Sequence, residues 1–261
     1  MCIICDGNYD PNMTSLDCSN CQRITSIPQL NQLTVLYCSN CRFLINIPQL
    51  DLLITLYCYE CQSLIKIPQL NQLATLCCYN CPLLNTLPQL NLLNILICEN
   101  CPLLNTLPQL NQLTRLECSR CPSLVTLPQL NQLDSLWCVS CPSLINIPQL
   151  NLLTRLNCSG CPLLNMLPQL NQLNWLYCNN CPFLVTLPQL DQLIWLFCDD
   201  CPLLYLPYKL RHKFNINPNY VINKIRYQQI KTRRKYRNIV SSIILNNTSF
   251  YDVLAEIIVN Y

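Results

Sequence analysis

Cysteine pairs of the form Cys-x-x-Cys are the residues best suited to chemistry in this chain of 261 residues. Of its 23 cysteines, 22 fall into eleven such pairs, which run from Cys2/Cys5 to Cys198/Cys201, and Cys77 lies outside the pattern. Thiolates from two neighbouring pairs can hold a tetrahedral Zn²⁺ at about 2.3 Å. The same spacing serves redox-active dithiols. The elements that position the pairs decide between such sites and simple packing.

A repeat of 20 residues positions the pairs. Its consensus is L-x-x-L-x-C-x-x-C-x-x-L-x-x-[LI]-P-Q-L-x-x. Its ten copies begin at Met13, Leu33, Leu53, Leu73, Leu93, Leu113, Leu133, Leu153, Leu173 and Leu193. The first part ends in period two and predicts a short strand in which Leu116 and Cys118 point to one side. The later L-x-x-L-P-Q-L has period three and predicts an extended or 3₁₀ return. A single copy cannot bury its apolar side, so we expect stacked copies that form a coil of parallel strands.

The phase of the cysteines favours packing over chemistry. They recur in step with the inward-facing leucines, and a free cysteine packs as a small hydrophobe with a weak S–H donor. Zinc bound between neighbouring pairs is one alternative. A disulfide ladder is another, because stacked strands about 4.8 Å apart bring equivalent cysteines within bridging range, although parallel side chains disfavour the required dihedral angle. We therefore predict buried thiols, no metal and no cofactor.

The repeat resembles that of the leucine-rich-repeat family. The family signature L-x-x-L-x-L-x-x-[NC]-x-x-L is met by Leu113, Leu116, Cys118, Cys121 and Leu124, and by the other copies over residues 13–210. The short period with L-P-x-L is similar to that of leucine-rich-repeat proteins of mimivirus-like giant DNA viruses. The resemblance implies a curved, right-handed solenoid with strands on its concave face and a role in protein binding. This chain differs in carrying cysteine where the family's buried asparagine satisfies backbone groups.

Charge divides the chain into two regions. Residues 1–204 carry six Lys and Arg against eleven Asp and Glu, a net of −5, whereas residues 205–261 carry ten against two, a net of +8. We predict an N-terminal cap (1–12), ten leucine-rich repeats (13–210) and a basic, mainly helical C-terminal cap (211–261). Within this cap, Ser249 and Asp252 form a capping box ahead of an apolar stripe. Such a helix would cover the open end of the stack.

A basic run in the C-terminal segment suggests a second partner. Lys231, Arg233, Arg234, Lys235 and Arg237 could bind nucleic acid or act as a nuclear-localisation signal. A solvated helix face explains the same residues, and we favour that interpretation because short basic runs are common.

Several functions find little support in the composition. The chain has two glycines, Gly7 and Gly160, and therefore no glycine-rich phosphate loop. Its one histidine, His212, has no nucleophile motif around it, so we predict that the protein is not an enzyme. The N-terminus lacks the features of a secretory signal, which predicts a reducing, cytoplasmic location, in the host cell if the protein is viral. Prolines interrupt the uncharged stretch between Lys66 and Glu99, so we expect no membrane segment.

The copies differ on the strand side and agree on the return side. The return sequence P-Q-L-[ND]-[QL]-L is nearly constant, which leaves it little capacity to select a ligand. We predict that a protein partner binds the concave face, through aromatic anchors with a charged rim on their N-terminal side. The predicted residues are Arg115, Glu117, Arg120, Trp137, Arg155, Trp175, Tyr177, Trp195 and Phe197. Cross-strand stabilisation by aromatics explains part of the same pattern.

Overall fold

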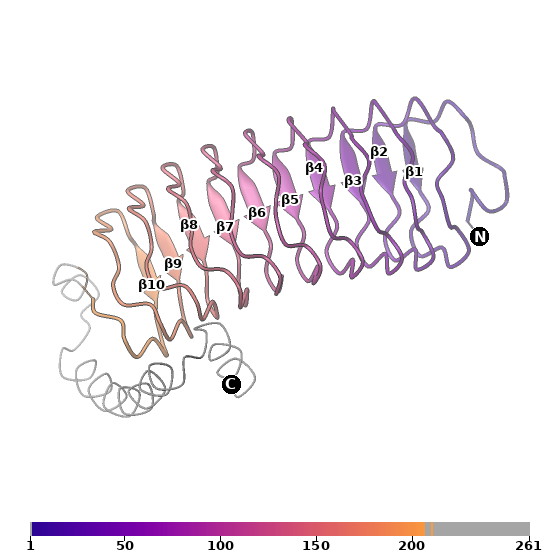
Figure 1. Cartoon of the computed structure of the whole chain (residues 1–261). Helices are drawn as coiled ribbons and strands as arrows, with labels where there is room; N and C mark the ends of the chain where they lie inside the picture. Colours follow the sequence, from indigo (N-terminus) through magenta and orange to yellow (C-terminus); the bar gives the residue numbers. More distant parts are fainter. Residues whose placement is uncertain (1, 207–209, 211–261) are drawn as a thin grey trace.

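A parallel sheet of ten short strands forms one side of the molecule (Figure 1). The computed structural model describes residues 2–206 and residue 210. The strands have three residues each: β1 (Ser15–Asp17), β2 (Val35–Tyr37), β3 (Thr55–Tyr57), β4 (Thr75–Cys77), β5 (Ile95–Ile97), β6 (Arg115–Glu117), β7 (Ser135–Trp137), β8 (Arg155–Asn157), β9 (Trp175–Tyr177) and β10 (Trp195–Phe197). They follow chain order in the sheet, and Leu116 lies opposite Leu136. The fold is a parallel β-solenoid built from 20-residue turns, as the periodicity predicts.

Each turn of the coil closes because its leucines point inward. In the turn around β6, Leu116 and Cys118 are fully buried, which confirms the predicted side-chain direction. A tight turn before the strand is closed by the N–H of Leu113, which donates to the carbonyl oxygen of Leu110 at 3.2 Å. A second turn follows the strand, where the N–H of Leu124 donates to the carbonyl oxygen of Cys121 at 3.2 Å. These two turns reverse the chain and connect strand to return.

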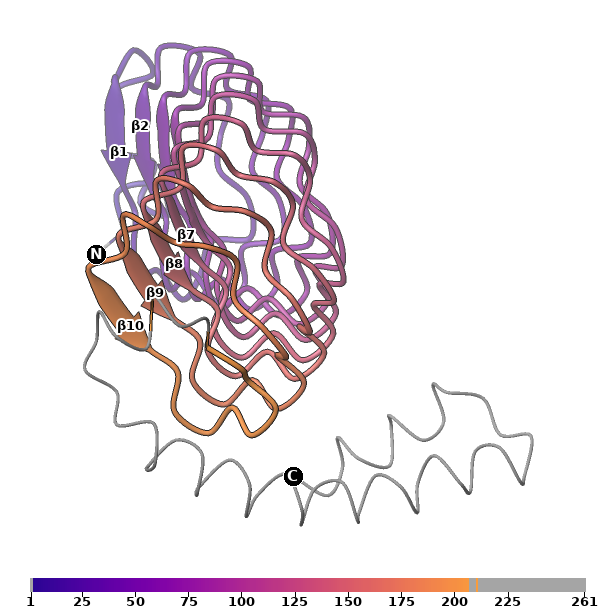
Figure 2. The ribbon, with the colours of Figure 1, turned by 90° about the vertical axis from the view of Figure 1, so that its left-hand side faces the viewer.

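The return segments are extended and lie on the flank opposite the strands (Figure 2). Adjacent returns are joined by isolated parallel bridges such as Lys66 to Thr86 and Met166 to Thr186. Residues 2–206 contain no 3₁₀ segment and no α-helix, so the 3₁₀ alternative is wrong and the extended one is correct. A 3₁₀ helix needs consecutive local hydrogen bonds, and the proline of each return has no N–H to donate. In addition, the N–H of Val185 donates to the carbonyl oxygen of Asn165 in the neighbouring turn and not to a residue of its own segment.

One hydrophobic core runs the length of the solenoid. The leucine columns and the cysteines from Cys18 to Cys201 are buried, apart from Leu196 and Cys198, which are half-buried. The predicted burial of the repeat cysteines is therefore confirmed for all but Cys198. At the N-terminal end, Ile3, Ile4 and Tyr9 pack against the core.

The predicted C-terminal helical cap, residues 211–261, lies outside the described residues. Within the part of the chain that the structure describes, no helix has the length and apolar character needed to span a membrane.

Candidate functional site on the strand face

The first and third residues of every strand point away from the core, and together they form a surface that we call the strand face. Parallel pairing in register places each residue beside its equivalent 20 positions away, so that Arg155 is flanked by Ser135 and Trp175. One row runs from Ser15 to Trp195 and the other from Asp17 to Phe197. The strand face is thus two parallel rows whose composition changes along the solenoid.

Four aromatic side chains gather at the C-terminal end of the strand face. We call Trp175, Tyr177, Trp195 and Phe197 the aromatic cluster. The ring centroids of Tyr177 and Phe197 are 4.6 Å apart with an interplanar angle of 4°, and those of Trp175 and Trp195 are 5.8 Å apart. Trp175 remains 39% exposed and Trp195 49%. Cross-strand stacking therefore orders these rings while leaving much of the indole surface open to solvent.

The predicted charged residues are arranged less simply than their order in the sequence suggests. Arg115 and Glu117 form an ion pair with each other, and the Nε of Arg115 donates to Oε1 of Glu117 at 2.7 Å. Arg155 is exposed beside the aromatic cluster. Between them, Trp137 is 40% exposed, and its indole N–H donates to Oγ of Ser135 at 3.2 Å. The rim on the N-terminal side of the aromatic cluster thus consists of the ion pair Arg115–Glu117, whose charges cancel, and of Arg155, which adds one positive charge.

Arg120 lies in the turn after β6 and not on the strand face. Its φ of 56° is left-handed, and its N–H donates to the carbonyl oxygen of Val139 at 2.7 Å. The same turn position is left-handed in every repeat, and asparagine or glycine, which tolerate this conformation best, occupy most of these positions. Backbone geometry therefore governs this position in each copy.

The N-terminal half of the strand face carries a set of tyrosines that the sequence analysis did not single out. On the strand face, Tyr37 stacks on Tyr57 with ring centroids 5.1 Å apart. In the turns that follow β3 and β4, Tyr59 stacks on Tyr79 at 4.6 Å. Cys77, the cysteine outside the pairs, is buried next to Tyr57 in the sheet. The 20-residue spacing of the tyrosines was the available signal, because parallel pairing places such residues side by side.

The second cysteine of each repeat after the first donates a hydrogen bond to the preceding turn. The thiol of Cys121 donates to the carbonyl oxygen of Cys98 at 3.2 Å, and both residues are fully buried. Nine such bonds, from Cys41 to Cys201, form what we call the thiol ladder. The S–H groups thus satisfy backbone carbonyls of the preceding turn, as a weak thiol donor can.

Burial and hydrogen bonding shift the pKa of the core thiols in both directions. Desolvation raises the pKa of Cys98 and Cys118, the first cysteines of their pairs, well above its usual range, and that of the ladder thiol Cys121 to about 12. A hydrogen bond shared with the first cysteine of the preceding turn lowers the pKa of three ladder thiols, Cys41, Cys101 and Cys181. Because the thiolate is the reactive form, the thiols with a raised pKa suit packing and hydrogen bonding better than redox chemistry.

The constant glutamine of the return has a structural role that the sequence analysis missed. The Nε2 of Gln109 donates to the carbonyl oxygen of Gln129 in the next turn and to Oδ1 of Asn111, the latter at 3.1 Å. Eight inter-turn bonds of this kind, from Gln29 to Gln169, form what we call the glutamine ladder. The sequence feature that could have predicted the glutamine ladder is the constancy of P-Q-L-[ND] in the return segments, although the glutamine is exposed.

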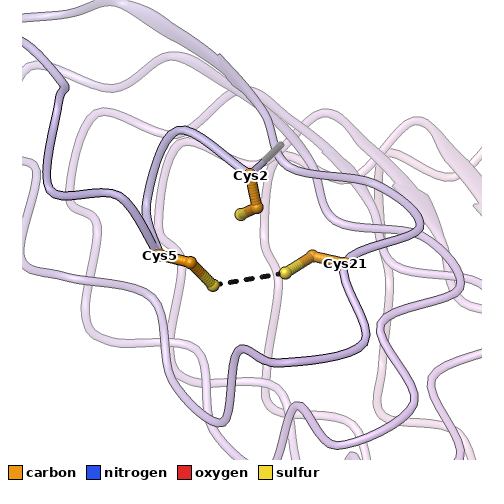
Figure 3. Close-up of side chains that lie close together, drawn as sticks. All are labelled: Cys2, Cys5 and Cys21. Carbon is orange, nitrogen blue, oxygen red and sulfur yellow. Dashed lines mark hydrogen bonds between the residues drawn. The ribbon is translucent and has the colours of Figure 1, made fainter.

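One group of three thiols lies outside the thiol ladder. The Sγ atoms of Cys2, Cys5 and Cys21 all lie within 4.8 Å of one another, and the side chains point toward a common space (Figure 3). Among the described residues, this is the one group of three or more Cys, His, Asp and Glu that could share a metal ion. In the sequence, the spacing sets this group apart: Cys2 precedes Cys18 by 16 positions, whereas equivalent cysteines of successive repeats are 20 positions apart.

The basic run Lys231–Arg237 lies outside the described residues. No protein-family model matches the chain, and a search of curated proteins finds no match. What the strand face binds must therefore be inferred from its own side chains.

Proposed function

We propose that the chain is a non-catalytic scaffold of the leucine-rich-repeat type that binds a protein partner on the strand face. The observation that carries the proposal is the exposure of three tryptophans, Trp137, Trp175 and Trp195, on adjacent parts of one ordered surface. Tryptophan, tyrosine and arginine are the residues that contribute most to protein–protein interfaces. Arg155 lies between Trp137 and the aromatic cluster in the sheet, which completes a typical set of anchors.

The return flank is the less suitable surface for recognition. Its repeated glutamines are already hydrogen-bonded within the glutamine ladder, and its sequence hardly changes from copy to copy. The strand face varies at each turn, from serine and threonine at one end to tryptophan at the other. A surface that discriminates between partners needs such variation, because selectivity is a difference between affinities.

The order within the aromatic cluster favours tight binding. Stacking between neighbouring strands already restricts the rings, so a partner that covers them loses little side-chain entropy in the complex. Each indole then contributes apolar area and one N–H donor.

We propose further that the protein acts in a reducing, cytoplasm-like compartment, where the free thiols of the thiol ladder are stable. We also propose that residues 211–261 form a helical cap.

The double substitution Trp175→Ala with Trp195→Ala tests the proposal. We expect loss of partner binding by about 2 kcal/mol or more, which is about 30-fold in affinity, since both side chains point away from the core. Affinity capture from the native cell, followed by quantitative binding of the captured protein, measures the effect.

A matched control separates recognition from general loss of apolar surface. Met166→Ala with Val185→Ala removes two side chains that are 61% and 50% exposed on the return flank. This control should bind as the unaltered protein does, and circular dichroism should show both variants folded. Equal binding by the tryptophan variant and the unaltered protein would show that recognition lies elsewhere.

A further inference from the structure

The thiol of Cys21 occupies the ladder position of the first repeat, where the pattern of the other repeats breaks off. Every later ladder thiol donates to a carbonyl oxygen of the turn before it, as Cys41 does to Cys18. Residues 1–12, which come before the repeat of Cys21, do not carry the repeat pattern. The Sγ of Cys21 instead lies 3.4 Å from the Sγ of Cys5 in the N-terminal segment. Cys21 thus lies at the equivalent position of its repeat but outside the thiol ladder, and its Sγ contacts another sulfur atom.

The other two thiols are presented by a tight turn. The N–H of Asp6 donates to the carbonyl oxygen of Cys2 at 3.1 Å, and the N–H of Gly7 donates to that of Ile4 at 3.2 Å. Gly7 has a φ of 67°, which glycine adopts without strain. A Cys-x-x-Cys pair on a tight turn, completed by a cysteine from another segment, is a common arrangement in zinc sites. In contrast, the pairs in the repeats flank a turn whose thiols are buried in the core, apart from the half-buried Cys198.

The geometry of the three sulfur atoms fits one small ion. Tetrahedral coordination at about 2.3 Å places sulfur atoms about 3.8 Å apart. The observed separations are 3.4 Å for Cys5 and Cys21 and within 4.8 Å for the other two pairs, so small side-chain rotations suffice. Cys2 and Cys5 are half-buried, so an ion can enter from solvent.

Zinc binds the thiolate form of cysteine, so binding at these three residues releases their thiol protons to solvent.

We propose that Cys2, Cys5 and Cys21 form a binding site for a thiophilic ion, Zn²⁺, which fastens the N-terminal segment to the first repeat. Three thiolates supply the ligands, and solvent or an external ligand takes the fourth position. Because Ile3 and Ile4 pack against the end of the core, holding Cys2 and Cys5 in place also keeps these apolar side chains over it. The site would therefore stabilise the end of the solenoid at β1, which is the edge strand of the sheet formed by the described residues.

Metal titration of the full chain under reducing conditions tests the site. We expect one equivalent of Zn²⁺ per chain by elemental analysis. Co²⁺ in its place should give thiolate-to-cobalt charge-transfer absorption and tetrahedral d–d bands. Cys2→Ser and Cys5→Ser should each weaken binding by about 100-fold or more. The matched control is Cys198→Ser, since Cys198 is also half-buried and also belongs to a Cys-x-x-Cys pair. Its metal content should equal that of the unaltered protein.

Four outcomes would overturn the proposal. They are the absence of stoichiometric metal in the folded, reduced protein, unchanged binding in Cys2→Ser and Cys5→Ser, tight binding of Cu⁺ with none of Zn²⁺, and a Cys5–Cys21 disulfide in protein purified with reductant. Circular dichroism on each variant shows whether loss of metal reflects loss of ligands or loss of fold. The metal content of the unaltered protein decides the question even if the variants unfold.

Discussion

The thiol ladder predicts that the two cysteines of one repeat contribute unequally to stability. Cys118 and Cys121 are both fully buried, and Cys118→Ala and Cys121→Ala each remove one sulfur from the core. A buried group of this size contributes about 1 kcal/mol. Cys121 also donates to the carbonyl oxygen of Cys98, and a buried acceptor that loses its donor costs about 1–3 kcal/mol. We therefore expect Cys118→Ala to lower the free energy of unfolding by about 1 kcal/mol and Cys121→Ala by about 2–4 kcal/mol.

Urea unfolding of the two variants, followed by circular dichroism, measures this difference. The comparison requires equal m-values, because a long repeat array can unfold in parts. Amide exchange at the affected turns gives an independent local measurement. Cys121→Ser serves as a further control, since its hydroxyl keeps a donor near the same carbonyl and should recover part of the loss. Equal destabilisation by the two alanine variants would refute the idea that the thiol hydrogen bond contributes beyond packing.

Three further predictions concern the glutamine ladder, the left-handed turn and the ionisation of the core thiols. Gln109→Ala should lower the unfolding free energy by about 1 kcal/mol in urea titration, whereas Gln112→Ala, an exposed glutamine of the same turn outside the ladder, should have little effect. Arg120→Gly should raise the melting temperature, because a φ of 56° costs a non-glycine residue about 1 kcal/mol. Burial raises the pKa of Cys121 and Cys141 from 9.0 to about 12, so the unfolded chain loses these protons first. Stability should then fall by about 1.4 kcal/mol per pH unit for each such thiol between pH 9 and 12, and unfolding followed against pH would show no such decline if the thiols were already ionised in the fold.

Much of the fold is predictable because a repeat limits the choices. Once Leu116 and Cys118 recur every 20 residues, in-register stacking is the arrangement that buries every copy, and the outward positions of Trp175 and Trp195 follow from the alternation along a strand. The pairing of Arg115 with Glu117 also follows in principle, since residues two apart on one strand share a face. The conformation of the return segments could not be predicted from the sequence, because a period of three fits both extended and 3₁₀ backbones.

The candidate sites were harder to predict where the role of a side chain depends on which residue it contacts in the fold. Constancy at exposed Gln109 is compatible with binding, folding or recent duplication, and only the position of the next carbonyl identifies the glutamine ladder. Likewise, Cys2 and Cys5 look like two more repeat cysteines until the turn that bears them folds back onto Cys21. The number of residues between two cysteines predicts their chemistry poorly when the chain path between them is irregular.

The two ladders run in opposite directions along the solenoid, so the array has polarity. Thiols donate toward the N-terminal end, as Cys201 does to Cys178, and glutamines donate toward the C-terminal end, as Gln169 does to Gln189. An array cut to whole repeats would therefore present a thiol donor and a vacant glutamine acceptor at one end, and the complementary groups at the other. Two such pieces are complementary head to tail and mismatched head to head. Head-to-tail contacts of that kind build an open-ended filament, or a ring where the rotation between pieces closes, so exposed repeat ends would not associate as a symmetric dimer.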